Sequence, residues 1–80
     1  MYYVYLIASE SDATRRYTGF ARDLKARLRS HNEGASKHTS KYRPWRIVAY
    51  FAFEDEGRAR AFEHYLKSGS GAAFANKRLW

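Results

Sequence analysis

Residues 2–8, Tyr-Tyr-Val-Tyr-Leu-Ile-Ala, decide the fold of this 80-residue chain. The stretch is aromatic and β-branched, and it lacks the alternation of polar and apolar residues found in a strand with one solvated face. It is typical of a strand that is buried on both faces. Ser9 to Thr14 are polar turn formers, and residues 15–20, Arg-Arg-Tyr-Thr-Gly-Phe, resume a strand. The first twenty residues therefore predict a β-hairpin.

The pattern becomes helical after this hairpin. Leu24 and Leu28 are spaced i and i+4 within a helix that we expect over residues 22–33. Asp23 lies near its N-terminal end, where a negative charge is favourable, and Gly34 stands at its C-terminal stop.

The second half of the chain predicts one strand and two helices. Residues 35–44 are expected to form a loop, and residues 55–68 and 72–77 to form helices. Between them lies a predicted strand over residues 45–53, whose apolar side chains alternate and should share one face: Trp45, Ile47, Ala49, Phe51 and Phe53. The order β-β-α-β-α-α describes one α+β domain over residues 1–80.

The chain is strongly basic. Fifteen Lys and Arg oppose eight Asp and Glu, which gives a formal net charge of +7, and ten of the fifteen are Arg. The planar guanidinium group matches phosphate oxygens in pairs. Nucleic acid is therefore the predicted partner, although charge alone says nothing about catalysis and would also suit an anionic membrane.

Several classes of protein are not supported by the composition. The longest apolar run, residues 2–8, is far shorter than the ~20 residues of a membrane span, and no basic segment precedes it. We therefore expect a cytoplasmic protein with no membrane partner. The chain has no cysteine, so any metal must be bound by oxygen or imidazole. A hard divalent ion such as Mg²⁺ or Mn²⁺ would fit such ligands.

Two polar residues of the first predicted helix border its apolar stripe. At 100° per residue, Arg27 and His31 fall within about 60° of Leu24, so both should look toward the sheet. Arg27 could be a site residue, could lay its stem over the core, or could pair with Asp23 at i,i+4 on the surface.

The second predicted helix carries a carboxylate on its apolar face. Ala59, Phe62, Glu63 and Leu66 follow the i, i+3, i+4, i+7 pattern. A buried charge is costly unless it is paired, so Glu63 needs either a metal ion or an arginine. Both alternatives remain open on the pattern alone.

The order of these motifs resembles the GIY-YIG nuclease superfamily. The motifs are Tyr3-Val4-Tyr5, Tyr17-Thr18-Gly19, then Asp23-Leu24 with Arg27 and His31, the helix of Glu63, and the run Lys67-Ser68-Gly69-Ser70-Gly71. The chain is most similar to small stand-alone bacterial members that are related to the N-terminal domain of the excision-repair nuclease UvrC. The resemblance covers nearly the whole chain and implies a three-stranded antiparallel sheet flanked by helices.

The resemblance also implies roles for single residues. Tyr5 and Tyr17 would direct their hydroxyls into the site, where one of them helps to activate the attacking water. Arg27 would neutralise charge on the scissile phosphate, and His31 would assist proton transfer. Two supporting residues and one metal ligand complete the set: Gly19, which allows close approach of the substrate, Asn76 near the C-terminus, and Glu63, which would hold one divalent cation, Mg²⁺ or Mn²⁺.

This chain departs from the family pattern at three positions. Tyr3 replaces the glycine of the first motif and Thr18 the isoleucine of the second. Phe20 stands where the excision-repair branch has a lysine, so a helper for water activation would have to be His31. With a reference pKa of about 6.5, histidine is largely neutral at pH 7 and can accept a proton.

The resulting prediction is a divalent-metal-dependent endonuclease that cleaves DNA, with DNA favoured over RNA, and that acts on particular DNA structures in repair or processing. Eight basic residues are candidates for gripping phosphates: Arg15, Arg16, Arg22, Arg29, Lys37, Lys41, Arg43 and Arg46. Tyr42 or Trp45 could stack on a base, or, as we favour for Trp45, pack in the core. Two alternatives are a nucleic-acid-binding module without efficient catalysis and an adaptor that docks a protein through Tyr50 or Trp80.

Overall fold

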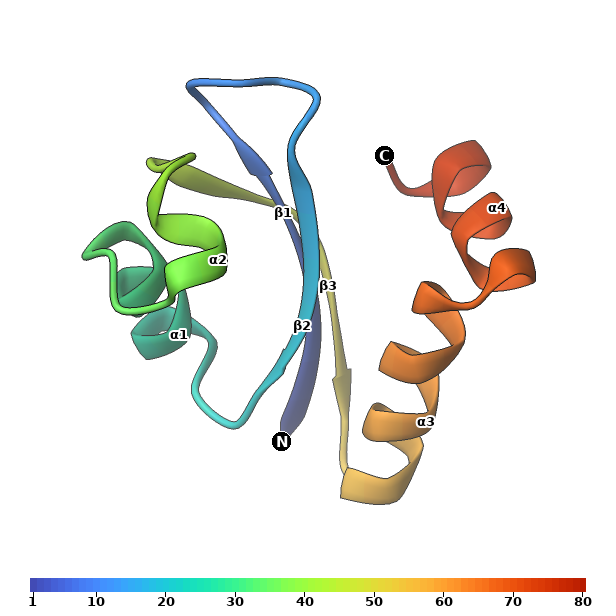
Figure 1. The fold of residues 1–80 in the computed structure, drawn as a ribbon. Helices are drawn as coiled ribbons and strands as arrows, with labels where there is room; N and C mark the ends of the chain where they lie inside the picture. Colours follow the sequence, from blue (N-terminus) through green and yellow to red (C-terminus); the bar gives the residue numbers. More distant parts are fainter.

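In the computed structural model, which describes all residues 1–80, three strands and four helices follow one another along the chain (Figure 1). They are β1 (Tyr2–Ser9), β2 (Arg16–Ala21), α1 (Leu24–Asn32), α2 (Lys37–Ser40), β3 (Trp45–Phe53), α3 (Glu56–Lys67) and α4 (Gly69–Arg78). The predicted fold class and element order are confirmed. One addition is α2, a single turn of helix within the segment that was expected to be a loop.

The strands form one antiparallel sheet in the order β2-β1-β3. Because β1 lies in the centre and both faces of the sheet are covered, its residues from Val4 to Ser9 are all buried. This position explains the unbroken apolar character of the first strand. Tyr5 pairs across the sheet with Gly19 on one side and with Tyr50 on the other.

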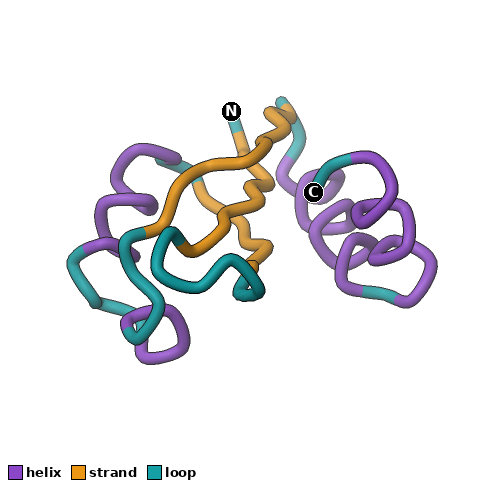
Figure 2. The backbone as a smooth tube through the Cα atoms, turned by 90° about the horizontal axis from the view of Figure 1, so that it is seen from above, coloured by secondary structure: helices purple, strands orange, loops and turns teal.

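Helices cover the two faces separately: α1 and α2 lie on one face, and α3 and α4 on the other (Figures 1 and 2). Alternate residues of β1 supply two cores. Val4 and Leu6 pack with apolar residues of α3 and α4, whereas Tyr5 and Ile7 belong to the core on the α1 side, with Trp45. None of the four helices combines the length and the apolar character needed to cross a bilayer.

The strand β3 contains an irregularity that the alternation did not predict. Leu6 faces Ala49 and Ile7 faces Ile47, so Val48 is an extra residue in the ladder. A bulge of this kind shifts the alternation of side chains by one.

The prediction that the apolar residues of β3 share one face is therefore wrong. Trp45 and Ile47 pack on the α1 side, whereas Phe51 and Phe53 pack against the α3 side. The expectation that Trp45 packs in the core is confirmed, because it is buried and its Nε1 donates to the Thr39 carbonyl at 2.8 Å.

The helix termini follow from their capping residues. The side chain of Asp23 accepts a hydrogen bond from the Ala26 amide at 3.0 Å, and that of Asp55 accepts one from the Arg58 amide at 2.8 Å. Each cap satisfies a backbone donor that the first turn leaves free. Asp23 thus starts α1 and forms no ion pair with Arg27, which removes one of the three alternatives for that arginine.

Candidate active site

The ring of Tyr5 lies across the neighbouring strand at Gly19. A Cβ built on Gly19 would overlap the hydroxyl and ring of Tyr5 and would lie 2.9 Å from Cε2 of Tyr17. Real Cβ atoms do not approach other atoms this closely, so the position requires glycine for space. The missing side chain at Gly19 allows the Tyr5 hydroxyl to reach α1.

A hydrogen-bonded chain extends from this hydroxyl. Nε of Arg27 donates to the Tyr5 oxygen at 3.2 Å, and the same hydroxyl lies 2.8 Å from Nε2 of His31. On its other side, Nδ1 of His31 lies 2.8 Å from Oγ1 of Thr39. Tyr5, His31 and Thr39 are almost completely buried, with 1%, 0% and 1% exposure. The chain Arg27–Tyr5–His31–Thr39 therefore joins β1, α1 and α2 through the interior.

Burial determines the protonation states of the hydrogen-bonded residues His31 and Tyr5. Burial lowers the pKa of His31 below its ordinary value, and the charge of Arg27 lowers it further. Burial raises the pKa of Tyr5, while the hydrogen bond from Arg27 opposes this rise. At neutral pH, His31 is thus a neutral imidazole with one donor and one acceptor nitrogen, and Tyr5 keeps its proton. Every buried polar side-chain atom has a hydrogen-bond partner.

Tyr17 is the tyrosine of this cluster that remains accessible. Its ring lies 5.2 Å from that of His31 and 6.3 Å from that of Tyr5, measured between centroids, and it is only half-buried. Tyr17 therefore forms the boundary between the buried chain and solvent.

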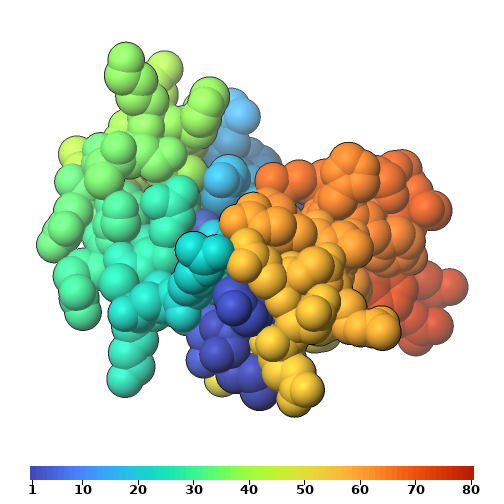
Figure 3. All heavy atoms as spheres, turned by 90° about the horizontal axis from the view of Figure 1, so that it is seen from below, coloured from blue at the N-terminus to red at the C-terminus, as the bar shows by residue number.

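Glu63 lies on α3, the helix that packs on the other face of the sheet from α1, near the edge strand β2. In Figure 3 the yellow and orange atoms of α3 meet the cyan atoms around residue 20, and Arg60 of α3 lies 4.1 Å above the Phe20 ring. The negative charge of Glu63 contributes to the raised pKa of Tyr5, so the carboxylate acts on the buried chain electrostatically. The structure thus brings together five of the predicted site residues and Gly19.

The partner of Glu63 is neither of the two foreseen. Nζ of Lys67, one turn further along α3, lies 3.0 Å from Oε2 of Glu63. The Glu63 side chain is 21% exposed, so its oxygens are accessible from solvent. No group of three or more His, Asp or Glu side chains gathers anywhere in the chain. A cation held here would have one protein carboxylate and would complete its shell with water and substrate oxygens, as Mg²⁺ commonly does.

Asn76 does not join this cluster. Its Oδ1 accepts a hydrogen bond from Nη1 of Arg16 at 3.1 Å on the surface, and Arg16 also lies 5.0 Å over the Trp80 ring. Asn76 therefore links α4 to the start of β2, next to Tyr17 in the sequence.

The eight predicted phosphate-binding residues are all exposed. Arg22 is bound to Glu56 at 2.9 Å, and Arg15 is 3.7 Å from Asp12. The other six make no ion pair. Arg16 is hydrogen-bonded to Asn76, and the remaining five have charges that are free for a polyanion: Arg29, Lys37, Lys41, Arg43 and Arg46.

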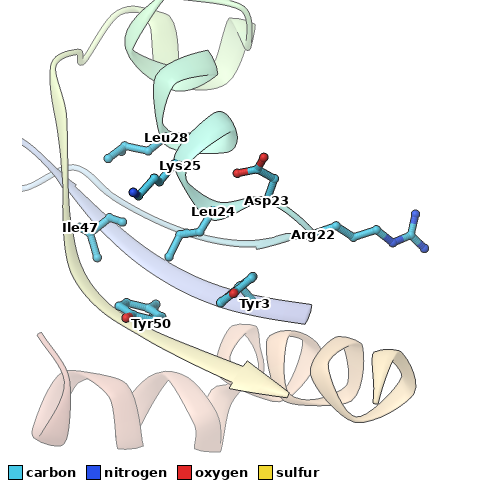
Figure 4. Close-up of a pocket in the computed structure, with 8 residues that line it drawn as sticks. All are labelled: Tyr3, Arg22, Asp23, Leu24, Lys25, Leu28, Ile47 and Tyr50. Atoms are coloured by element: carbon cyan, nitrogen blue, oxygen red, sulfur yellow. The ribbon is translucent and has the colours of Figure 1, made fainter. Parts of the chain in front are cut away.

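A pocket of about 570 Å³ opens on the α1 side of the sheet, away from this cluster (Figure 4). Its lining is largely apolar and includes Tyr3, Leu24 and Tyr50, while Arg22 points outward at its margin. None of the residues of the hydrogen-bonded chain lines it. The candidate active site at the β2 edge is therefore separate from this pocket.

Thr39 is the member of the site that sequence reasoning missed. Thr39 lies eight residues after His31, and Gly34, the predicted end of the helix, stands between them. Neither a helical nor a strand repeat therefore predicts that these two side chains meet. The available signal was Ser36, an N-cap residue type that precedes the turn of α2.

Comparisons with known proteins show the family of this chain. A family model described as the GIY-YIG catalytic domain matches residues 1–78. The chain belongs to the GIY-YIG family. It is 32% identical over 68 residues to a UPF0213 protein of Clostridium perfringens, covering 84% of this chain and 71% of the relative. A UPF0213 protein of Haloquadratum walsbyi is likewise 32% identical over 68 residues, covering 84% of this chain and 74% of the relative.

A third relative is named as a nuclease subunit. The structure-specific endonuclease subunit SLX1 homolog of Giardia intestinalis is 36% identical over 76 residues, which cover 89% of this chain and 21% of that protein. The chain thus corresponds to about a fifth of that relative. The family and this relative together support a nuclease function with a nucleic-acid substrate.

Proposed function

We propose that this protein is a divalent-metal-dependent endonuclease that hydrolyses phosphodiester bonds in DNA of particular structure, in cytoplasmic DNA repair or processing. The observation that carries the proposal is the convergence of Arg27, Tyr17 and Glu63 around the buried pair Tyr5–His31. An arginine, a partly exposed tyrosine and a single carboxylate, drawn from α1, β2 and α3, suit phosphoryl chemistry.

Arg27 is the proposed clamp for the scissile phosphate. Its Nε is occupied by the Tyr5 oxygen, which fixes the plane of the guanidinium group. The hydrogen bond to Tyr5 also raises the pKa of Arg27, so the group stays charged. The guanidinium also lies near the Tyr17 hydroxyl, which contributes to the raised pKa of Arg27, and its remaining N–H groups can donate to phosphate oxygens. Such fixed donors stabilise charge that grows on the phosphate in the transition state.

Tyr17 is the proposed contact for the attacking water, because it is the tyrosine of the cluster that is only half-buried. We assign His31 a different task from the one that the sequence suggested. It has no access to solvent, and both its nitrogens are bound, so it reaches the reaction only through Tyr5. His31 and Thr39 are therefore positioning residues that hold the hydroxyl to which Arg27 is anchored.

Glu63 is the proposed ligand of the divalent ion. When bound, Mg²⁺ or Mn²⁺ would polarise the phosphate and stabilise the leaving oxygen. Two observations support Glu63 as a metal ligand: its side chain is partly exposed, and it already binds a cationic group, the ammonium of Lys67. The unpaired basic residues of the surface would hold the nucleic-acid backbone, with an affinity that falls as salt rises.

The test is a gel assay with end-labelled branched, single-stranded and duplex DNA and a matched RNA, in Mg²⁺ or Mn²⁺. We expect products that disappear with a chelator and in Glu63→Ala and Arg27→Ala. Glu10→Ala and Arg58→Ala are matched controls, because both side chains are exposed and form no ion pair. Mobility shifts without products, unchanged in the site variants, would instead establish a non-catalytic nucleic-acid-binding module.

A further inference from the structure

Lys67 lies between two groups of the candidate site. Its Nζ is 3.0 Å from Oε2 of Glu63 and 5.7 Å from the centroid of the Tyr17 ring. The ammonium group therefore occupies the space beside the carboxylate, on the side of the partly exposed tyrosine. The Lys67 side chain is 50% exposed, so it can swing away from Glu63 into solvent.

We propose that Lys67 is a built-in counter-ion that competes with the divalent cation for Glu63 and that couples cation binding to substrate binding. The inference rests on the proposed function, because it concerns the same carboxylate. In the free protein, the lysine neutralises Glu63. A divalent ion can take this carboxylate oxygen only after the ammonium has left it, so the free protein binds the ion weakly.

The displaced ammonium does not leave the site. Lysine has a four-carbon stem with several rotatable bonds, and this stem is anchored one helical turn from Glu63, facing Tyr17. A phosphate group that binds beside Tyr17 offers the lysine a new anionic partner. Substrate thus removes the competitor from Glu63, and by linkage the cation must in turn favour substrate binding by the same factor.

A plain structural role is the competing explanation for the same contact. Glu63 and Lys67 are spaced i,i+4 in the favourable order on a helix, and such pairs stabilise helices in many proteins. The same helix provides a comparison pair, because Glu56 and Arg60 are also spaced i,i+4, at 2.9 Å, and Arg60 makes no ion pair with Glu63. Removing either cation takes one i,i+4 ion pair from α3, but only the loss of Lys67 frees Glu63 and should therefore change the affinity for metal.

The experiment is a titration of Mn²⁺, with binding measured by calorimetry and by the electron paramagnetic resonance signal of the free ion. It compares the full chain with Lys67→Met and Arg60→Met. Each protein also carries Arg27→Ala, so that no substrate is cleaved. An exposed ion pair contributes little, so we expect Lys67→Met to bind Mn²⁺ about two- to fivefold more tightly, and Arg60→Met to bind it unchanged.

A second arm adds a short DNA duplex to each protein. With Lys67 present, the DNA should raise the affinity for Mn²⁺ several-fold. In Lys67→Met this increase should be smaller, because only the direct binding of phosphate oxygens to Mn²⁺ then contributes to it. Equal affinities for Mn²⁺ in Lys67→Met and Arg60→Met, or a loss of affinity in Lys67→Met, would overturn the proposal. Cleavage that depends on Glu63 in the gel assay would still support the nuclease function, so the two failures are distinguishable.

Discussion

Gly19→Ala adds one methyl group at the point where two strands and two tyrosines meet. The new Cβ would overlap the Tyr5 hydroxyl and ring and would lie 2.9 Å from Tyr17. Tyr5 cannot move aside cheaply, because its ring is buried and its hydroxyl is bound to both Arg27 and His31. Overpacking costs about 1–3 kcal/mol, and a broken buried hydrogen bond about another 1–3 kcal/mol.

The expected loss is therefore about 2–6 kcal/mol of the free energy of unfolding, out of about 4–12 kcal/mol for a domain of this size. Urea denaturation followed by fluorescence measures it, and a loss of ~3 kcal/mol lowers the midpoint by roughly 2 M at a slope of about 1.5 kcal/mol/M. Cleavage should fall too, because the anchor of Arg27 is displaced.

The matched control is Gly69→Ala at the start of α4, where an added Cβ meets nothing within 4 Å. Alanine is the better helix former, so this variant should be as stable as the parent or up to about 1 kcal/mol more stable. If Gly19→Ala also unfolded within about 0.5 kcal/mol of the parent, a difference typical of a neutral surface substitution, the reasoning that Gly19 makes room for Tyr5 would be refuted.

Three further predictions concern the site. Arg27→Lys keeps the charge but removes the fixed fork anchored at Tyr5, so cleavage should fall by about 10²–10³-fold while the protein stays folded, as single-turnover rates and circular dichroism would show. Glu63→Ala should abolish cleavage and leave DNA binding within about threefold in a mobility-shift titration; equal loss of both would remove the metal assignment. The pKa of His31 is lowered by folding, so the unfolded state binds its proton first, and stability should decline as pH falls through about 6.5. Urea midpoints at about pH 7.5 and 5.5, one unit to either side of that value, test this, and in His31→Gln the difference should shrink.

The parts of the fold that were predicted are those with local signals. The continuous apolar stretch of residues 2–8 indicated burial on both faces, and its position in the centre of the sheet confirms this. The helix α1 was recognised from the spacing of Leu24 and Leu28 and from the negative charge of Asp23 near its start, and α3 from an acidic first turn; the structure shows that Asp23 and Asp55 cap these two helices. Their ends differ by only a few residues from the expected bounds.

The errors arise where tertiary contacts override a local pattern. The alternation of β3 looked unbroken, yet the extra residue at Val48 is visible only in its pairing with β1. Thr39 was missed because its contact with His31 depends on the path of the chain around Gly34, which has a φ of +80°. Lys67 was within reach of sequence reasoning, because its i,i+4 spacing from Glu63 is local, but only a metal or an arginine was considered.

The bulge at Val48 also determines where the length of this chain is free to vary. Because one added residue turns β3 over, its first half serves the α1 layer and its second half the α3 layer. Deleting Val48 would remove the bulge and leave a regular strand in which Trp45 and Ile47 still face the α1 layer and Phe51 and Phe53 still face the α3 layer. Insertions at the polar hairpin turn over residues 10–15 would disturb neither layer. Among chains that share this architecture, length differences should therefore gather in that turn and, within the third strand, be limited to the presence or absence of the bulge residue.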